Sequence, residues 1–120
     1  MWTVQFGAEA NQASKVRHGA EGFLRGQGVT DQIDTITLLL SELVTNAMRY
    51  AVAPRRATVS IEAKTVRVTV DDATSQPPRV LPTDLMRPGG NGMRIVSSLA
   101  TTWGVQGKLV GKSVWFTVPR

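Results

Sequence analysis

The feature that most constrains this chain is a long amphipathic segment that precedes a proline. Its apolar residues recur every three or four positions, which places them on one face of a helix: Ile33, Ile36, Leu39, Leu40, Leu43, Val44, Ala47 and Met48. Thr30 or Asp31 offers an N-cap, and Pro54 prevents the helix from continuing beyond about Tyr50 or Ala51. The segment therefore predicts a helix that buries one face in the core.

The other elements are read from alternating apolar and polar residues, which are typical of half-buried strands. Helices are also expected at about 8–26 and 93–102, and a run of prolines makes the stretch 72–87 mostly loop. The expected strands span residues 2–6, 57–62, 66–71, 104–109 and 113–118. Because strand pairs flank the helices, we expect an α+β two-layer sandwich, with a mixed, mostly antiparallel sheet covered on one face by about three helices.

The composition is typical of one cytoplasmic domain spanning residues 1–120. The absence of cysteine excludes disulfides, thiolate zinc sites and a cysteine nucleophile, and it fits a reducing cytosol. We find neither a signal peptide nor an apolar stretch long enough to cross a membrane. The net charge of +5 favours a polyanionic partner: a nucleotide, an acidic protein or a nucleic acid.

Two polar residues share one face of the amphipathic helix. Glu42 and Asn46 are four positions apart, so their side chains lie one above the other. An amide oxygen is a hard, neutral ligand suited to Mg²⁺, and a carboxylate can hold a metal-bound water or accept a proton. The pair indicates either such a site or a solvated polar face.

A pair of acids, Asp71 and Asp72, ends a β-branched strand. An acid where a rigid strand runs into a surface loop is well placed to meet a ligand, and its carboxylate can accept a hydrogen bond from the exocyclic amine of adenine. A turn-forming aspartate is the alternative. Successive strand residues point to opposite faces, so Val66, Val68 and Val70 should share one face. Asp72 continues this row of every second residue, which favours Asp72 over Asp71 as the ligand-facing acid.

A glycine-rich loop, Gly89-Gly90-Asn91-Gly92, directly precedes the helix expected at 93–102. Glycines let the backbone approach an anion closely, and a helix N-terminus points free N–H groups at it. This loop is therefore a candidate phosphate-binding site. It is not a Walker loop, because the Gly-Lys-Ser tripeptide of this chain, at 111–113, lies in a predicted hairpin turn and not before a helix.

The order of these features resembles the GHKL ATPase family, which includes gyrase-type topoisomerases, heat-shock chaperones, histidine kinases and anti-sigma-factor serine kinases. A Glu-x-x-x-Asn helix is followed by a strand ending in Asp, a loop, Gly-x-Gly opening a helix, and Gly-x-Ser entering a strand. The resemblance covers residues 8–119. The anti-sigma branch in particular is similar to the segments SELVTNA (41–47), GMRIV (92–96), WGV (103–105) and SVWF (113–116). The fold implied is the Bergerat-type ATP-binding fold.

The resemblance implies ATP and Mg²⁺ as cofactors, and it implies roles for residues of the amphipathic helix. Asn46 would bind Mg²⁺, and Glu42 would act as general base or orient a water molecule. Arg49 would lie near the phosphates and contact them or a partner protein, unless it is an exposed cation at the helix end.

The resemblance also implies roles for residues outside that helix. Asp72 would accept the adenine amino group, and Gly90 and Gly92 would lie under the phosphates. Ser113 stands where the family usually has a threonine near the adenine. Two features depart from the family: the acidic motif reads Asp72-Ala73-Thr74 in place of Asp-x-Gly, and the segment 75–88 is short and proline-rich for an ATP lid.

These implications lead to one expected function and two alternatives. We expect an ATP-dependent protein serine/threonine kinase of the anti-sigma-factor type, which phosphorylates an anti-anti-sigma antagonist, sequesters a sigma factor, or does both. The resemblance is compatible with a homodimer. The altered acidic motif and short lid favour a non-catalytic ATP-binding module that acts by protein contact. The positive charge alone favours a nucleic-acid-binding protein, although no basic stripe interleaved with aromatic residues accompanies it.

Overall fold

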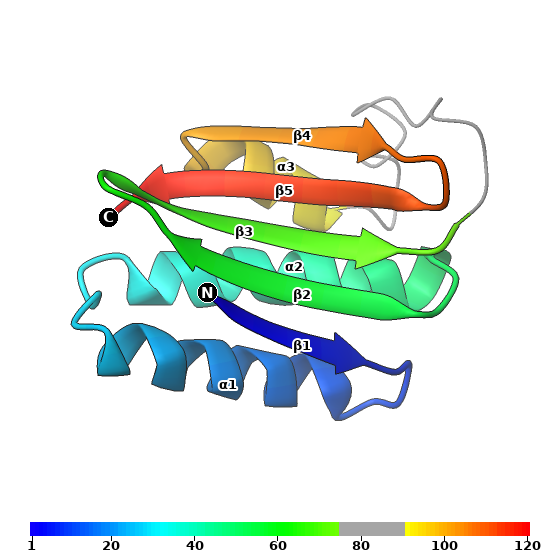
Figure 1. Ribbon diagram of the computed structural model, residues 1–120, viewed down its shortest axis with the longest axis horizontal. Coiled ribbons are helices and arrows are strands. Elements are labelled where there is room, and N and C mark those ends of the chain that lie inside the picture. Colours follow the sequence, from blue (N-terminus) through cyan, green and yellow to red (C-terminus); the bar gives the residue numbers. More distant parts are fainter. Residues whose placement is uncertain (75–90) are drawn as a thin grey trace.

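The computed structural model describes residues 1–74 and 91–120. Within these ranges the chain forms a two-layer α+β sandwich with the helices on one face of the sheet, as Figure 1 shows, so the predicted fold class is confirmed. The elements in chain order are β1 (Trp2–Phe6), α1 (Gln12–Gly26), α2 (Ile33–Tyr50), β2 (Arg55–Ile61), β3 (Thr65–Asp72), α3 (Asn91–Leu99), β4 (Thr102–Gly107) and β5 (Lys112–Pro119).

The sheet has the strand order β1-β2-β3-β5-β4, and each neighbouring pair is antiparallel. β3 is therefore central, between β2 and β5. Its register with β5 places Asp71 opposite Ser113 and Asp72 opposite Lys112. Helix α2 packs between α1 and α3 and against β3 (Figure 1).

The core lies between α2 and the central strands. Val66, Val68 and Val70 of β3 are fully or almost fully buried, which confirms that the valines of this strand alternate inward. They share the core with apolar residues of α2 such as Leu40 and Leu43. Because strand residues alternate between faces, Asp72 continues the buried row and is itself buried.

The structure corrects three predicted helix starts. Helix α1 begins at Gln12, because residues 8–11 form a turn in which the Gln12 N–H donates to the Glu9 carbonyl and the Gln12 side chain accepts from the Gly7 N–H. The predicted N-cap of α2 at Thr30 or Asp31 is wrong, since Gln32 holds that position without a capping side-chain bond. Helix α3 begins at Asn91, which places Asn91 and Gly92 of the glycine loop inside the helix.

One large aromatic side chain of β5 lies outside the core. Trp115 of β5 is half-buried on the sheet face turned away from the helices, where the Arg67 guanidinium stacks 4.5 Å from its ring centroid. Gly104 of β4 lies against the same ring, and a Cβ there would come within 3.0 Å of it. Trp115 therefore packs within a polar sheet surface and not in the main core.

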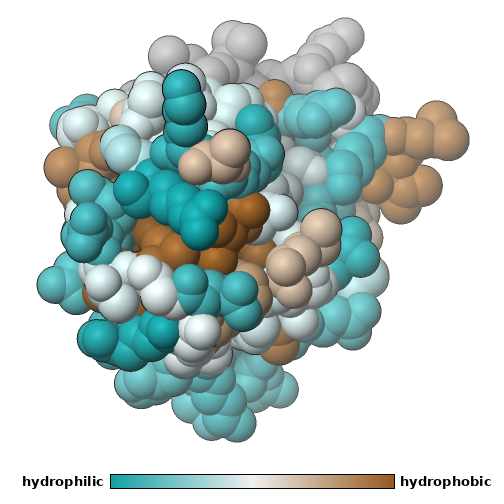
Figure 2. Space-filling view, turned by 60° about the vertical axis from the view of Figure 1, so that its left-hand side comes forward, coloured by the Kyte–Doolittle hydropathy of each residue, from teal (hydrophilic) through white to brown (hydrophobic). Residues whose placement is uncertain are grey.

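The surface seen in Figure 2 is mostly hydrophilic and surrounds a hollow with a hydrophobic floor. Large apolar side chains are exposed elsewhere as well, notably Leu109 and Val110 in the turn between β4 and β5. In the described ranges we find no helix long and apolar enough to cross a membrane.

Candidate functional site

The carboxylate of Asp72 is the buried polar centre of the candidate site. Its side chain is 2% exposed, at the end of β3 and on the face that packs against α2. Oδ1 accepts a hydrogen bond from the Thr74 backbone N–H at 2.8 Å, and Oδ2 accepts one from Lys112 Nζ at 2.8 Å. Because burying a charge is costly unless it is paired, Lys112 and the Thr74 amide together explain how this acid is tolerated.

A small pocket lies beside this carboxylate, between the C-terminal half of α2 and the paired ends of β3 and β5. Its volume is about 30 Å³. It is lined by two predicted site residues, Asn46 and Asp72, and by Leu43, Ala47, Tyr50, Ala51, Val70, Lys112 and Val114. The structure therefore brings the predicted metal ligand and the predicted adenine acid to one mainly apolar recess.

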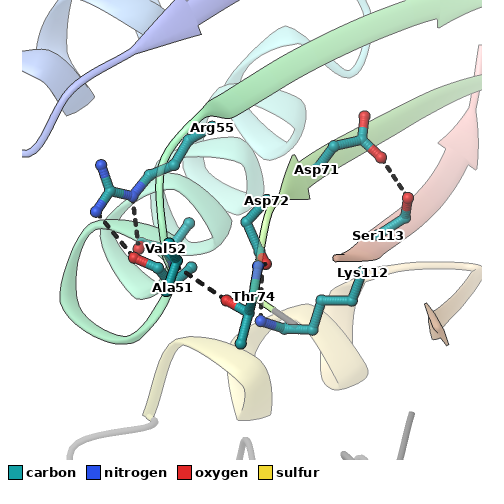
Figure 3. A network of polar contacts seen from close by, with 9 residues as sticks. Ala51, Val52, Arg55, Asp71, Asp72, Thr74, Lys112 and Ser113 are labelled. Carbon is teal, nitrogen blue, oxygen red and sulfur yellow. Dashed lines mark hydrogen bonds and ion pairs between the residues drawn. The ribbon is translucent and has the colours of Figure 1, made fainter. Parts of the chain in front are cut away.

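Backbone and side-chain contacts join the end of α2 to the start of β2 and to the end of β3, as Figure 3 shows. The Arg55 guanidinium donates to the Ala47 carbonyl at 3.1 Å and to the Ala51 carbonyl at 2.8 Å. The Ala47 carbonyl also accepts from the Ala51 N–H, so Arg55 is its second donor, and Arg55 gives the Ala51 carbonyl at the end of the helix a donor from outside the helix. Next to them, the Ala73 N–H donates to the Val52 carbonyl at 2.9 Å. The pocket wall formed by the last turn of α2 is thereby held against β3.

Thr74 stands where the resembled family has the glycine of its Asp-x-Gly motif, and the structure gives it a defined role. Its backbone N–H donates to Asp72, while its hydroxyl accepts a hydrogen bond from the Val52 N–H at 3.0 Å. The threonine therefore joins the acid to the segment that follows α2 (Figure 3).

Gly111 sets how closely the β4–β5 turn approaches Asp72. Its φ of +89° lies in the left-handed region, and a Cβ at this position would overlap the Asp72 carbonyl oxygen. Only glycine combines that conformation with that close approach without strain. Gly111 thereby places Lys112, the next residue, directly opposite Asp72.

Asp71 and Ser113 lie on the opposite face of the sheet from the pocket. Ser113 Oγ donates to Asp71 Oδ1, and Lys108 Nζ lies 2.6 Å from the same oxygen. Burial alone would raise the pKa of Asp71, but the hydrogen bonds from Lys108 and Ser113 and the charges of Lys108 and Arg56 outweigh burial and hold that pKa below its usual value. The structure therefore does not bring the Ser113 hydroxyl to the Asp72 carboxylate.

The remaining predicted residues surround the pocket or lie outside the described ranges. Glu42 is half-buried, one helical turn before Asn46, and is not among the pocket residues. Arg49 is exposed near the end of α2. Gly92 is the second residue of α3, a helix that packs on α2, whereas Gly90 lies outside the described residues. The roles of all four stay predictions.

Lys112, Thr74 and Arg55 are the site residues that the sequence analysis did not identify. For Lys112 a signal was present: Val114, Phe116 and Val118 are the apolar row of β5, and strand parity places Lys112 in that row. The hydrogen bonds of Thr74 and Arg55 join these residues to the end of α2 and the segment after it. No periodic pattern in the sequence indicates that these segments lie close together.

The donor set of the pocket fits a magnesium ion only together with a bound phosphate. Among the described residues we find no group of three or more histidine, cysteine, aspartate or glutamate side chains that could hold a metal. Mg²⁺ is commonly held by few protein oxygens plus substrate phosphates. The amide oxygen of Asn46 at the pocket is compatible with that arrangement.

Comparison with protein families gives one match over nearly the whole chain. The family model described as "Histidine kinase-like ATPase domain" matches residues 6–118. No curated protein matches this chain.

Several solved structures with a similar fold are histidine kinases. The Erythrobacter litoralis EL346 blue-light activated histidine kinase matches with a TM-score of 0.57 and 27% identity, over 74% of this chain and 30% of that one. A structure of the histidine kinase domain from that protein matches with a TM-score of 0.56 and 21% identity, over 89% and 60% of the two chains. The Acinetobacter baumannii histidine kinase AdeS matches with a TM-score of 0.52 and 16% identity, over 99% and 66%. This chain thus spans less than two thirds of the length of each of these structures.

Proposed function

Because this chain belongs to the histidine kinase-like ATPase domain family, we propose that it binds ATP in the pocket between α2, β3 and β5. The observation that carries the proposal is that Asn46 and Asp72, distant in sequence, line the same recess. Apolar side chains such as Leu43 and Val114 would contact the faces of the purine, and Asp72 would accept its exocyclic amine. This arrangement has the features of a small-molecule site: apolar walls with a few placed polar groups.

The phosphates would extend from this pocket toward the N-terminus of α3. Gly92 lies in the first turn of that helix, where free N–H groups favour an anion. Asn46 would contribute its amide oxygen to Mg²⁺, and the ion would neutralise charge on the phosphates. Arg49, at the end of α2, would contact the phosphates or a partner protein.

For the reaction we propose transfer of the γ-phosphoryl group of ATP to a serine or threonine hydroxyl of a protein substrate. Glu42 would accept the hydroxyl proton as the new O–P bond forms, and ADP would leave with the electrons of the broken P–O bond. Similarity of the segment 41–47 to the anti-sigma branch supports this choice. The substrate would be an anti-anti-sigma antagonist, the domain would also sequester a sigma factor in the cytoplasm, and homodimerisation fits this role.

A second candidate is an ATP-binding module without phosphoryl transfer, which acts by protein contact. Two observations favour it: Thr74 replaces the motif glycine, and Lys112 occupies one oxygen of Asp72. Incubation with labelled [γ-³²P]ATP and a candidate antagonist separates the two. Label on the antagonist supports the kinase; clear ATP binding with persistently unlabelled antagonist supports the module.

Calorimetric titration with Mg-ATP tests the binding site itself. Asp72→Asn removes an anionic acceptor in the pocket, and the matched variant Asp71→Asn makes the same change on the opposite face of the sheet. We expect the first to weaken ATP binding at least tenfold, about 1.4 kcal/mol, and the second to change it less than threefold. The reverse order would assign the adenine contact to Asp71. Asn46→Ala should abolish binding in a folded protein, and wild-type affinity in that variant would refute the magnesium assignment.

A further inference from the structure

The ion pair between Lys112 and Asp72 stands out by its burial. Lys112 Nζ lies 2.8 Å from Asp72 Oδ2, and the two side chains are 14% and 2% exposed. In every other ion pair that we find between described residues, at least one side chain is more than 40% exposed. Water screens those surface pairs, whereas the Lys112 pair lies inside the candidate nucleotide pocket.

This pair occupies the carboxylate that would recognise the base. Oδ2 of Asp72 accepts from the Lys112 ammonium, and Oδ1 accepts from the Thr74 N–H. The Lys112 ammonium adds the attraction of a full positive charge to its hydrogen bond with the carboxylate, whereas an adenine amine is a neutral donor. The amine therefore competes at Oδ2 with a stronger donor that is already in place.

The Lys112 side chain also occupies space that a base would need. With Lys112 among its lining residues, the pocket has a volume of about 30 Å³. That volume is room for one or two water molecules, whereas adenine has nine ring atoms and an exocyclic nitrogen. The β4–β5 turn has little freedom to shift, because Gly111 lies so close to the Asp72 backbone that a Cβ at this position would overlap the Asp72 carbonyl oxygen.

We propose that Lys112 is a built-in competitor of the nucleotide, which fills the base recess and holds Asp72 until ATP displaces it. The inference rests on the proposed function, and it identifies Lys112 as a determinant of nucleotide affinity. Its four-carbon stem is flexible, so rotation about side-chain bonds moves the ammonium out of the recess while β5 keeps its register. Nucleotide affinity is consequently set by the exchange of one Asp72 partner for another.

A series of Lys112 variants tests this by calorimetric titration with Mg-ATP. Lys112→Ala empties the recess and frees the carboxylate, Lys112→Met frees the carboxylate but keeps the volume, and Lys112→Arg keeps both obstacles. The control is Lys108→Met, which removes the same charge from the Asp71 cluster on the opposite face. We expect at least tenfold tighter binding for Lys112→Ala, a smaller gain for Lys112→Met, and changes below threefold for Lys112→Arg and the control. Unchanged or weaker binding in Lys112→Ala would overturn the inference.

A second measurement is needed because a variant that leaves Asp72 buried without its partner is destabilised. In the wild-type chain, acylation of each lysine by an amine-reactive ester is followed by mass spectrometry with and without Mg-ATP. We expect ATP to raise the acylation rate of Lys112 at least threefold and to leave Lys108 unchanged. Protection of Lys112 by ATP would overturn displacement, because it would mean that the lysine stays and contacts the nucleotide.

The two proposals fail in different ways. Wild-type binding of ATP with no gain in Lys112→Ala would refute the competitor and leave the nucleotide site standing. Absence of ATP binding in the wild type and in folded Lys112→Ala alike would refute the nucleotide site, and the competitor with it. Binding by Lys112→Ala where the wild type shows none would support both.

Discussion

The Arg55 guanidinium caps the last turn of α2, which forms one wall of the candidate site. Replacing Arg55 therefore tests how much this cap contributes to the stability of the fold. In Arg55→Met two hydrogen bonds from a charged donor disappear, to the Ala47 carbonyl and the Ala51 carbonyl. Hydrogen bonds to charged groups contribute about 1.5–3 kcal/mol when buried, and a cation at a helix C-terminus adds about 0.3–1 kcal/mol. Since Arg55 is only partly buried, we expect a loss near the lower end, about 2 kcal/mol.

Urea and thermal unfolding of Arg55→Met beside Arg56→Met provide the matched comparison. The neighbouring Arg56 side chain is 53% exposed and forms one ion pair, with 3.7 Å between its Nε and Asp71 Oδ2. Such surface pairs contribute about 0–1 kcal/mol. We expect the melting temperature to fall by about 6–8 °C for Arg55→Met and by less than about 3 °C for Arg56→Met. Equal losses of stability in the two variants would refute the inference that the contacts between the Arg55 guanidinium and the last turn of α2 stabilise the fold.

Three further perturbations test other parts of the structure. Gly111→Ala should lower the free energy of unfolding in urea by about 2 kcal/mol or more, because the new Cβ would overlap the Asp72 carbonyl at positive φ. The control Gly22→Ala, in open space on α1, should raise the free energy of unfolding by up to about 1 kcal/mol. Equal changes in the two variants would contradict this expectation. The lowered pKa of Asp71 stabilises the fold above the unfolded value of about 3.9, and this stability is lost as pH falls through the folded pKa. Asp71→Asn should therefore flatten the acid side of the stability profile, and an unchanged slope would contradict that assignment. Phe116→Ala should cost about 3–5 kcal/mol because the ring is fully buried, and a loss below about 1 kcal/mol would mean that the core is packed differently.

Local periodicity predicted much of the fold and the placement of Asn46 and Asp72, whose roles stay predictions. The alternation of valines in β3 selects Asp72 over Asp71, and the structure places Asp72 on the buried face. The four-residue spacing of Glu42 and Asn46 places both on α2, where Asn46 lines the pocket. These predictions hold because side-chain direction follows directly from the helix and strand repeats.

What the sequence did not show depends on contacts between distant segments. Applied to β5, strand parity would have placed Lys112 and not Ser113 on the face of Asp72, but its ion pair requires the register between β3 and β5. The Arg55 contacts depend in the same way on how the chain turns after α2. The predicted start of α2 failed for a different reason: Thr30 accepts a turn hydrogen bond from the Ile33 N–H through its backbone carbonyl, so the helix starts later than the capping residues indicate.

A crystal structure with Mg²⁺ and a non-hydrolysable ATP analogue tests the nucleotide site most directly. We expect the purine between α2 and the start of β5, its exocyclic amine on the Asp72 carboxylate and Lys112 withdrawn from the recess. A purine bound on the opposite sheet face, beside Asp71 and Lys108, or bound with the Lys112–Asp72 pair intact, would contradict the account.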